Sequence, residues 1–156
     1  MILLLNNRQR RHQFKSHQLK KVAARILSAL GCPDATELSI SIVGDRTIRI
    51  INRDYLGKDR PTNVISFSLQ EGDFGGVNPH ALGDVILSAD TAAREAEDGG
   101  LEFFERLSFL LLHGILHLCG FDHERSGEIE AAKMEQKEQQ LFRILKKEGL
   151  LSPTGL

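Results

Sequence analysis

Residues 101–119 are apolar on nearly every side when drawn as a helix, unlike the amphipathic helices elsewhere in the chain. Such a helix must be covered all round by other elements, so we predict that it forms the buried centre of the fold. The 156 residues suffice for one compact domain with a real core, spanning residues 1–156. No apolar run approaches the roughly 20 residues that cross a bilayer, so no membrane association is expected.

Strands and helices are mixed along the rest of the chain. Residues 37–43 alternate apolar and polar side chains, as in a strand, whereas residues 16–30 follow the helical period. Ser16 is expected to cap this helix, and Gly31 with Pro33 to end it. The full prediction is strands at 2–8, 37–43, 62–69 and 83–88, and helices at 16–30, 45–56, 89–97, 101–119 and 127–148. The mixture indicates an α+β or α/β class.

Two loops separate the predicted elements in the middle of the chain. Helix 45–56 places Ile48, Ile51 and Tyr55 on one face, and the charged loop 57–61 follows because Pro61 disfavours helix in the residue before it. The stretch 71–82 contains glycine and proline and is predicted to be a second loop.

The net charge of −1 hides an asymmetry. Seven basic and no acidic residues precede Asp34, and the remainder carries 13 basic and 21 acidic side chains. A basic edge on an otherwise acidic protein can attract a polyanion such as RNA, although a solvated helix face is the alternative. The basic residues are Arg8, Arg10, Arg11, Lys15, Lys20, Lys21 and Arg25.

The two cysteines, Cys32 and Cys119, are far apart in sequence and do not suggest a disulfide framework. They are expected to be small buried side chains in a reducing compartment. The opening MILLL is too short for the core of a signal peptide and is predicted to begin a strand. We therefore expect a cytoplasmic protein.

The segment HGILHLCGFDH at 113–123 has the form H-x3-H-x5-H. His113 and His117 lie one turn apart on the buried helix, so both side chains can reach one ion. Gly120 can take the left-handed conformation that ends a helix, and His123 can then turn back to the same ion. Buried histidines without partners would cost on the order of 1–3 kcal/mol each, and a shared metal supplies the partner.

Three imidazoles leave a fourth tetrahedral position for water, as in a catalytic zinc site. Cys119 should point away from the ion because it lies about 200° around the helix from His117. Asp122 and Glu124 flank His123 and are either hydrogen-bond partners that orient an imidazole or surface acids. The remaining histidines, His12, His17 and His80, lie in polar stretches and are expected at the surface.

The histidine spacing matches part of the metzincin pattern H-E-x-x-H-x-x-G-x-x-H. In those peptidases a glutamate after the first histidine is the general base, and here that position is Gly114. Met134 lies inside a predicted helix and does not resemble a Met-turn. A peptidase or other amide hydrolase would have to find its base elsewhere.

The block HGILHLCGFDH, preceded by GKDRPTNVISF and LGDVILS, resembles the YbeY family of bacterial endoribonucleases, also called ribosomal RNA maturation factors. The resemblance covers roughly residues 38–145. It implies an α+β domain with a mixed four-stranded sheet and about five helices. It also implies one zinc ion per chain on His113, His117 and His123, which would be catalytic residues as well as ligands. The implied activity is cleavage of single-stranded RNA in ribosomal RNA processing and ribosome quality control in the cytoplasm.

The chain departs from the family pattern before the PTNVISF block. An arginine held to be essential in the family corresponds here to Leu56, so that role cannot be carried over. Our hypothesis is that Arg60 or Lys58 in the same loop contacts phosphate, with solvated loop charges as the alternative. Asn63 and Ser66 on the following strand could contact substrate, although Ser66 could equally be a sheet-packing residue. Asp84 could bind a histidine or cap a turn.

Three hypotheses for function follow from the sequence. The first is a zinc-dependent endoribonuclease, in which zinc activates a water or polarises a phosphoryl oxygen and a nearby cation stabilises the growing charge. The nucleophile is either that water or the RNA 2′-hydroxyl. The second is a zinc peptidase or amide hydrolase, and the third is a non-enzymatic ribosome-associated protein with a structural metal.

Overall fold

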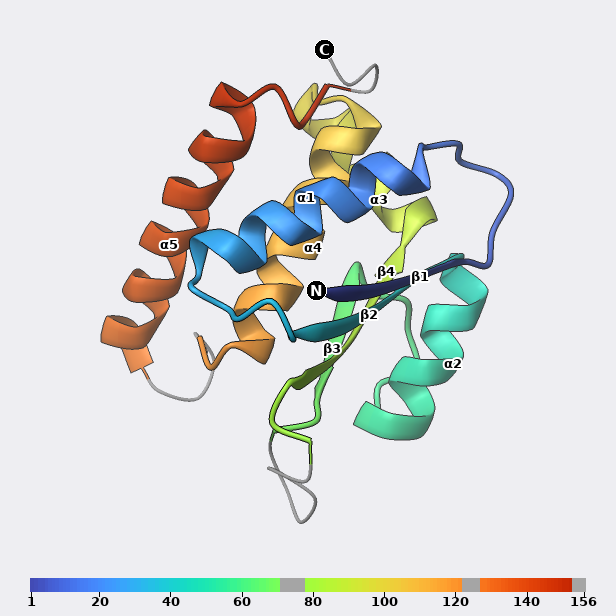
Figure 1. Cartoon of the computed structure of the whole chain (residues 1–156). Helices are drawn as coiled ribbons and strands as arrows, with labels where there is room; N and C mark the ends of the chain where they lie inside the picture. The colour runs from blue at the N-terminus through green and yellow to red at the C-terminus, as the bar shows by residue number, and fades with distance from the viewer. Residues whose placement is uncertain (71–77, 122–126, 153–156) are drawn as a thin grey trace.

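A four-stranded sheet with helices on both faces forms the framework of the computed structural model, which describes residues 1–70, 78–121 and 127–152 (Figure 1). The strands are β1 (Ile2–Asn7), β2 (Glu37–Val43), β3 (Val64–Ser68) and β4 (Ala81–Ser88). The helices are α1 (Ser16–Ala29), α2 (Asp45–Leu56), α3 (Ala89–Gly99), α4 (Phe103–Leu118) and α5 (Gly127–Lys147).

The sheet is mixed, with strand order β1-β2-β4-β3. Strands β1, β2 and β4 run parallel, and β3 is an edge strand antiparallel to β4. Helix α1 makes the crossover from β1 to β2 that parallel neighbours require. The mixed sheet and five helices confirm the α+β class.

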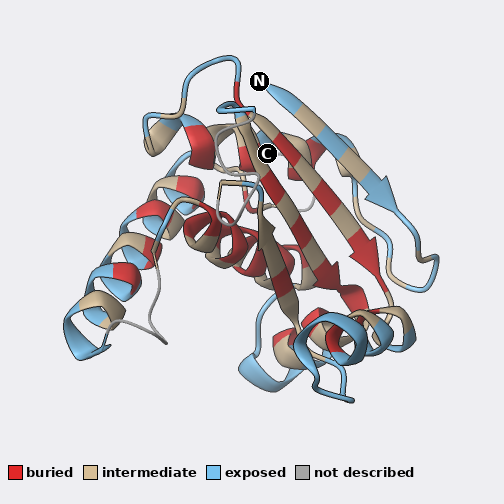
Figure 2. Cartoon of the chain, turned by 90° about the horizontal axis from the view of Figure 1, so that it is seen from below, coloured by how far each residue is buried: buried red, intermediate tan, exposed pale blue. Residues whose placement is uncertain are grey.

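The predicted buried centre is confirmed as helix α4. Ten of its residues are buried, and eight of these join one core cluster with α1, β2, β4 and α5. The apolar side chains of β2, Leu38, Ile40 and Ile42, belong to this cluster, as the alternation in the sequence predicts. Figure 2 shows the buried positions gathered where α4 and the strands face each other.

Helix α2 covers part of the opposite face of the sheet. Ile48 packs there with Val43 and Ile65, with Phe67 beside them. Tyr55 was predicted to share the face of Ile48 and Ile51, and its ring contacts Phe67 at 5.5 Å between centroids, although the residue is 72% exposed.

The predicted helix ends are confirmed in two places and wrong in one. Gly31 and Gly120 have φ angles of 77° and 96° and follow α1 and α4, as predicted. At the start of α1, however, the N-cap is Lys15, and its side chain makes no capping hydrogen bond. Ser16 already belongs to the helix, so its hydroxyl is not at the capping position.

The other predicted boundaries agree with the structure to within about two residues, as is usual for element ends. Strand β4 begins at Ala81, inside the loop predicted at 71–82, and residues 71–77 lie outside the described part of the chain. No described helix has the length and apolar character needed to cross a membrane.

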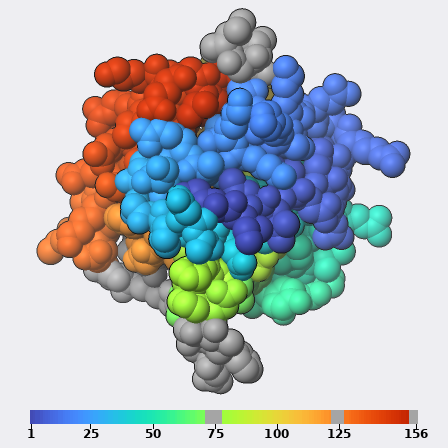
Figure 3. Space-filling model, viewed as in Figure 1, coloured from blue at the N-terminus to red at the C-terminus, as the bar shows by residue number. Residues whose placement is uncertain are grey.

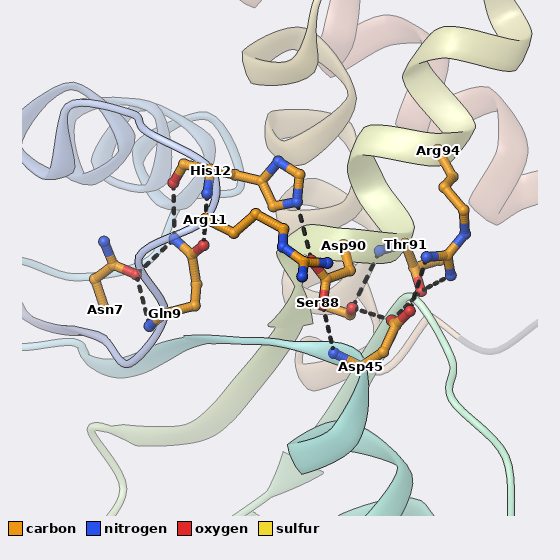
Figure 4. A network of polar contacts seen from close by, with 9 residues as sticks. All are labelled: Asn7, Gln9, Arg11, His12, Asp45, Ser88, Asp90, Thr91 and Arg94. Carbon is orange, nitrogen blue, oxygen red and sulfur yellow. Dashed lines mark hydrogen bonds and ion pairs between the residues drawn. The ribbon is translucent and has the colours of Figure 1, made fainter.

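A polar network joins the start of α2 to the start of α3 (Figure 4). The Asp45 carboxylate accepts hydrogen bonds from the hydroxyls of Ser88 and Thr91, both at 2.6 Å, and pairs with Arg94 at 2.8 Å. Desolvation, the largest contribution, raises the pKa of Asp45, but the three donors together outweigh it and hold the pKa below its ordinary value. Asp90 accepts a hydrogen bond from the Asp45 backbone N–H at 2.9 Å.

Both cysteines are free thiols that pack, half-buried, against the core cluster. The pKa of the Cys119 thiol is raised to about 12. Burial is the largest cause, and the neighbouring Cys32 thiol contributes further. A thiol with so high a pKa stays protonated at neutral pH and is a poor nucleophile, which agrees with a packing role.

Candidate functional site

The centre of the candidate site is a pair of histidines on α4. His113 and His117 lie four residues apart, so their side chains emerge one turn apart on the same side of the helix. Their Nε2 atoms are 3.1 Å apart, and the ring centroids are 4.7 Å apart at 74°. The geometry confirms that the spacing brings two imidazoles together.

Glu138 from α5 fixes the orientation of one of these rings. Its Oε2 lies 2.8 Å from Nδ1 of His113. The Glu138 residue is 9% exposed, so this carboxylate is largely removed from water. When Nδ1–H donates to the carboxylate, the lone pair of the neutral imidazole lies on Nε2, the atom that faces His117.

Glu138 was missed by the sequence analysis, although a signal was available. It lies on the face of α5 that carries Met134, Leu141 and Leu145, which are all buried and spaced by three to four residues. A single carboxylate on such an apolar face needs a partner. Nothing in the sequence, however, says that His113 on another helix is that partner.

Two contacts besides the core hold α5 against α4 and so help to place Glu138. Phe109 and Phe142 meet edge to face with ring centroids 5.3 Å apart. One turn further along both helices, Lys146 forms an ion pair with Glu105 at 3.0 Å.

Gly114 brings α4 into close contact with the sheet. A Cβ atom added there would lie 2.7 Å from Cγ1 of Val85 and 3.1 Å from Oγ of Ser66. The Ser66 hydroxyl donates a hydrogen bond to the Gly114 carbonyl at 3.1 Å. The sheet therefore fills the space that a glutamate would need at this position.

The third predicted ligand, His123, lies outside the described residues, as do Asp122 and Glu124. Among residues 1–70, 78–121 and 127–152 no cluster of three metal-binding side chains is found. The three-histidine metal centre thus stays a prediction.

The loop that follows α2 is anchored by Asn52. This residue is 2% exposed, and its side-chain amide donates to the Arg60 carbonyl at 2.8 Å. Asp59 is paired with Arg49 at 2.8 Å. In the part of the chain that the structure describes, Lys58 and Arg60 are exposed and form no ion pair. Leu56, at the position of the family arginine, is 52% exposed.

Asn63 and Asp84 are placed by other contacts. The Asn63 amide donates to the Glu95 carboxylate at 3.2 and 3.3 Å, and Glu95 also pairs with Arg106 at 3.0 Å. Asp84 is opposite Phe67 in the β3–β4 ladder, on the sheet face away from α4, because Val85 is the β4 residue beside Gly114. The hypothesis that Asp84 binds a histidine of α4 is therefore not supported.

We expect Gly114→Ala to destabilise the protein. Val85 is β-branched and fully buried, so it cannot move aside, and overpacking of this kind costs about 1–3 kcal/mol against a helix-propensity gain of about 1 kcal/mol. Denaturant unfolding should show a net loss of up to about 2 kcal/mol. Gly99→Ala is the matched control, since its Cβ would meet only the Leu101 side chain at 3.8 Å. Equal stability of both variants would contradict the packing argument.

We expect Glu138→Ala to release the His113 ring. Loss of the buried acceptor should cost about 1–3 kcal/mol in the free energy of unfolding, and Glu138→Gln, which keeps an acceptor, should cost less. Nitrogen NMR of the imidazole should show a proton held on Nδ1 in the parent chain and a mixture of tautomers in Glu138→Ala. An unchanged tautomer in that variant would show that Glu138 does not orient the ring.

Comparison with known proteins agrees with this arrangement of sheet and helices. The family model described as "Endoribonuclease YbeY" matches residues 4–146. A Geobacter metallireducens protein named endoribonuclease YbeY is 64% identical over 97% of this chain and 100% of its own length, and one from Syntrophotalea carbinolica is 54% identical over 94% and 97%.

The solution structure of TM1509 from Thermotoga maritima shares the fold. It superposes with a TM-score of 0.61 at 20% identity and covers 97% of this chain and 96% of its own. The family model spans most of the chain, and the Geobacter relative aligns over its full length. The resemblance seen in the histidine and PTNVISF blocks is thereby confirmed, and the chain belongs to the endoribonuclease YbeY family.

Proposed function

We propose that this chain is a zinc-dependent endoribonuclease that cuts single-stranded RNA in ribosomal RNA processing and ribosome quality control in the cytoplasm. The observation that carries the proposal is the convergence of the His113 and His117 Nε2 atoms, 3.1 Å apart, in a chain of the YbeY family. The names of the relatives state endoribonuclease activity for those proteins, and the proposal extends it to this chain.

The donor set fits a zinc ion. Two imidazole nitrogens on one tetrahedral zinc, with Zn–N bonds of about 2.0–2.1 Å, lie roughly 3.3 Å apart, close to the separation of the two Nε2 atoms. The hydrogen bond from His113 Nδ1 to Glu138 is the outer partner that metal-binding histidines usually have. His123 would be the third ligand.

In this mechanism the protein side chains bind and orient the RNA. Lys58 and Arg60 would bind the phosphate, with Arg60 also stabilising the charge that grows during cleavage. Asn63, directly before β3, and Ser66 within β3 would contact substrate. When bound, zinc supplies Lewis acidity toward a phosphoryl oxygen and a water activated near neutral pH.

The packing at Gly114 disfavours the peptidase hypothesis. In metzincin peptidases the residue after the first histidine is the glutamate that serves as general base. Here that residue lacks a side chain, and Val85 and Ser66 occupy the space where one would begin. The non-enzymatic hypothesis instead predicts bound metal without cleavage of any substrate.

The test measures metal content and cleavage on one preparation of the full chain. We expect stoichiometric zinc and cleavage of single-stranded RNA, with duplex RNA and casein uncut. The rate of cleavage should fall more than about 100-fold in His117→Ala. Even mutation of a residue that only hydrogen-bonds a metal ligand typically lowers metal affinity or activity by about 10–100-fold. His80→Ala, at an exposed histidine, is the control.

The other outcomes decide between the hypotheses. Cleavage of casein but not RNA would favour the amide hydrolase, and zinc without any cleavage would favour the non-enzymatic protein. Cleavage retained in His117→Ala would point to a contaminating nuclease and remove the support for the proposal.

The basic loop has its own test. We expect the double variant Lys58→Ala/Arg60→Ala to lower kcat/KM for single-stranded RNA by at least about tenfold, because donors to a developing anion are each worth about 10²–10³ in rate. The double variant Arg46→Ala/Arg53→Ala on α2 removes the same charge and is the control. If neutralising Lys58 and Arg60 leaves cleavage intact, the loop has no catalytic part.

A further inference from the structure

The seven basic residues before Asp34 have no part in the proposed reaction, and the structure shows where they lie. They belong to the loop at residues 8–15, which follows β1, and to helix α1. Figure 3 shows this N-terminal part of the chain as one continuous surface on the face in view. We call it the N-terminal basic surface and define it by Arg8, Arg10, Lys15, Lys20 and Lys21.

These five cations are not neutralised within the described structure. The other two basic residues of the segment are paired: Arg25 with Glu148 at 2.8 Å, and Arg11 with Asp90 at 3.7 Å. In residues 1–70, 78–121 and 127–152 no ion pair involves any of the five, and four of them are exposed, with Lys20 half-exposed. The surface therefore presents a concentrated positive charge to solvent.

The start of α1 adds to this charge. The N-terminal end of a helix carries a partial positive charge, which acidic side chains or a capping residue usually offset. Here Lys15 occupies the N-cap without a side-chain hydrogen bond, and the first turn of this 14-residue helix has no acidic residue. The protein's own side chains leave the helix end uncompensated, whereas a bound anion would compensate it.

The loop is held in place rather than left free (Figure 4). His12 places its Nε2 2.9 Å from Oδ1 of Asp90 and stacks on Phe103 with ring centroids 5.4 Å apart. The Gln9 side-chain amide donates to the His12 carbonyl at 2.8 Å and to Oδ1 of Asn7 at 2.9 Å. The cations are therefore carried on an ordered backbone, which lowers the entropy that binding would cost.

The surface is remote from the histidine pair along α4. Phe103, on which His12 stacks, is the first residue of that helix, and His113 and His117 follow ten and 14 residues later. At 1.5 Å per residue the separation along the helix axis is about 15–21 Å. An extended polyanion could occupy both places, whereas a single phosphate could not.

We propose that the N-terminal basic surface binds the phosphate backbone of structured RNA, separately from the place where the chain is cut; this inference rests on the proposed function. Backbone binding of this kind is independent of sequence and is driven by the release of counterions. A membrane fits less well. Surface-bound helices insert an apolar face, and the apolar face of α1, formed by Leu19, Val22, Ala23, Ile26 and Leu27, is buried in the core.

The test compares two full-length variants with the same loss of charge. Arg8→Gln/Arg10→Gln/Lys15→Gln removes three cations from the surface, and Lys133→Gln/Arg143→Gln/Lys147→Gln removes three from α5. Binding to a blunt-ended RNA duplex is measured by fluorescence anisotropy over a range of salt concentrations. Cleavage of a short single-stranded RNA and binding to phosphatidylcholine–phosphatidylserine vesicles are measured in parallel.

We expect the first variant to bind the duplex at least about tenfold more weakly at ~0.1 M salt, with the slope of log affinity against log salt reduced by about 2–3. The α5 variant should bind nearly as the parent chain does, and both variants should cut the short RNA at the parent rate. Those binding results would support RNA binding by the N-terminal basic surface even if the parent chain proved unable to cut RNA. In that case only the proposed function would fail.

Three results would overturn the inference. The first is a parent chain that does not bind the duplex, and the second is equal loss of binding in both variants. The third is unchanged duplex binding combined with lost vesicle binding in the first variant, which would assign the surface to a membrane. If the parent chain cuts RNA in any of these cases, the proposed function stands without the surface.

Discussion

The close packing of α4 on the sheet at Gly114 is the contact on which the arrangement of the candidate site depends. A helix that lacks a side chain at this point can approach the Val85 and Ser66 side chains directly. The approach sets the position of the helix turn that carries His113, the preceding residue, relative to β3 and β4. A larger residue would push the helix away from the sheet, and the histidine pair would move with it.

A second constraint comes from the opposite side of α4, where α5 supplies a carboxylate. Glu138 lies on an apolar helix face, and a buried carboxylate without a partner would be strongly destabilising. His113 is that partner, and in turn the carboxylate selects the tautomer whose lone pair lies on Nε2. Packing and hydrogen bonding together leave the Nε2 lone pair of His113 facing His117.

Two groups of cations, the basic loop and the N-terminal basic surface, lie in different regions of the fold. Lys58 and Arg60 lie in a loop that Asn52 anchors to α2, directly before the strand that packs on α4. The N-terminal basic surface follows the end of β1, and His12 in its loop stacks on Phe103 at the start of α4. Two groups of cations suit a long anionic ligand that needs one set of contacts for binding and another for reaction.

Local sequence determined most of the helices and strands, and it also determined that His113 and His117 lie on the same side of one helix. Hydrophobic period specified the strands and helices, and the i,i+4 spacing of His113 and His117 on a buried helix fixed their shared side. Tertiary structure decided the rest: that Tyr55 packs on Phe67 yet stays exposed, that Asp84 faces away from α4, and that Glu138 reaches His113. These outcomes depend on strand order and helix packing between residues far apart in sequence, and a local pattern holds no information about such pairings.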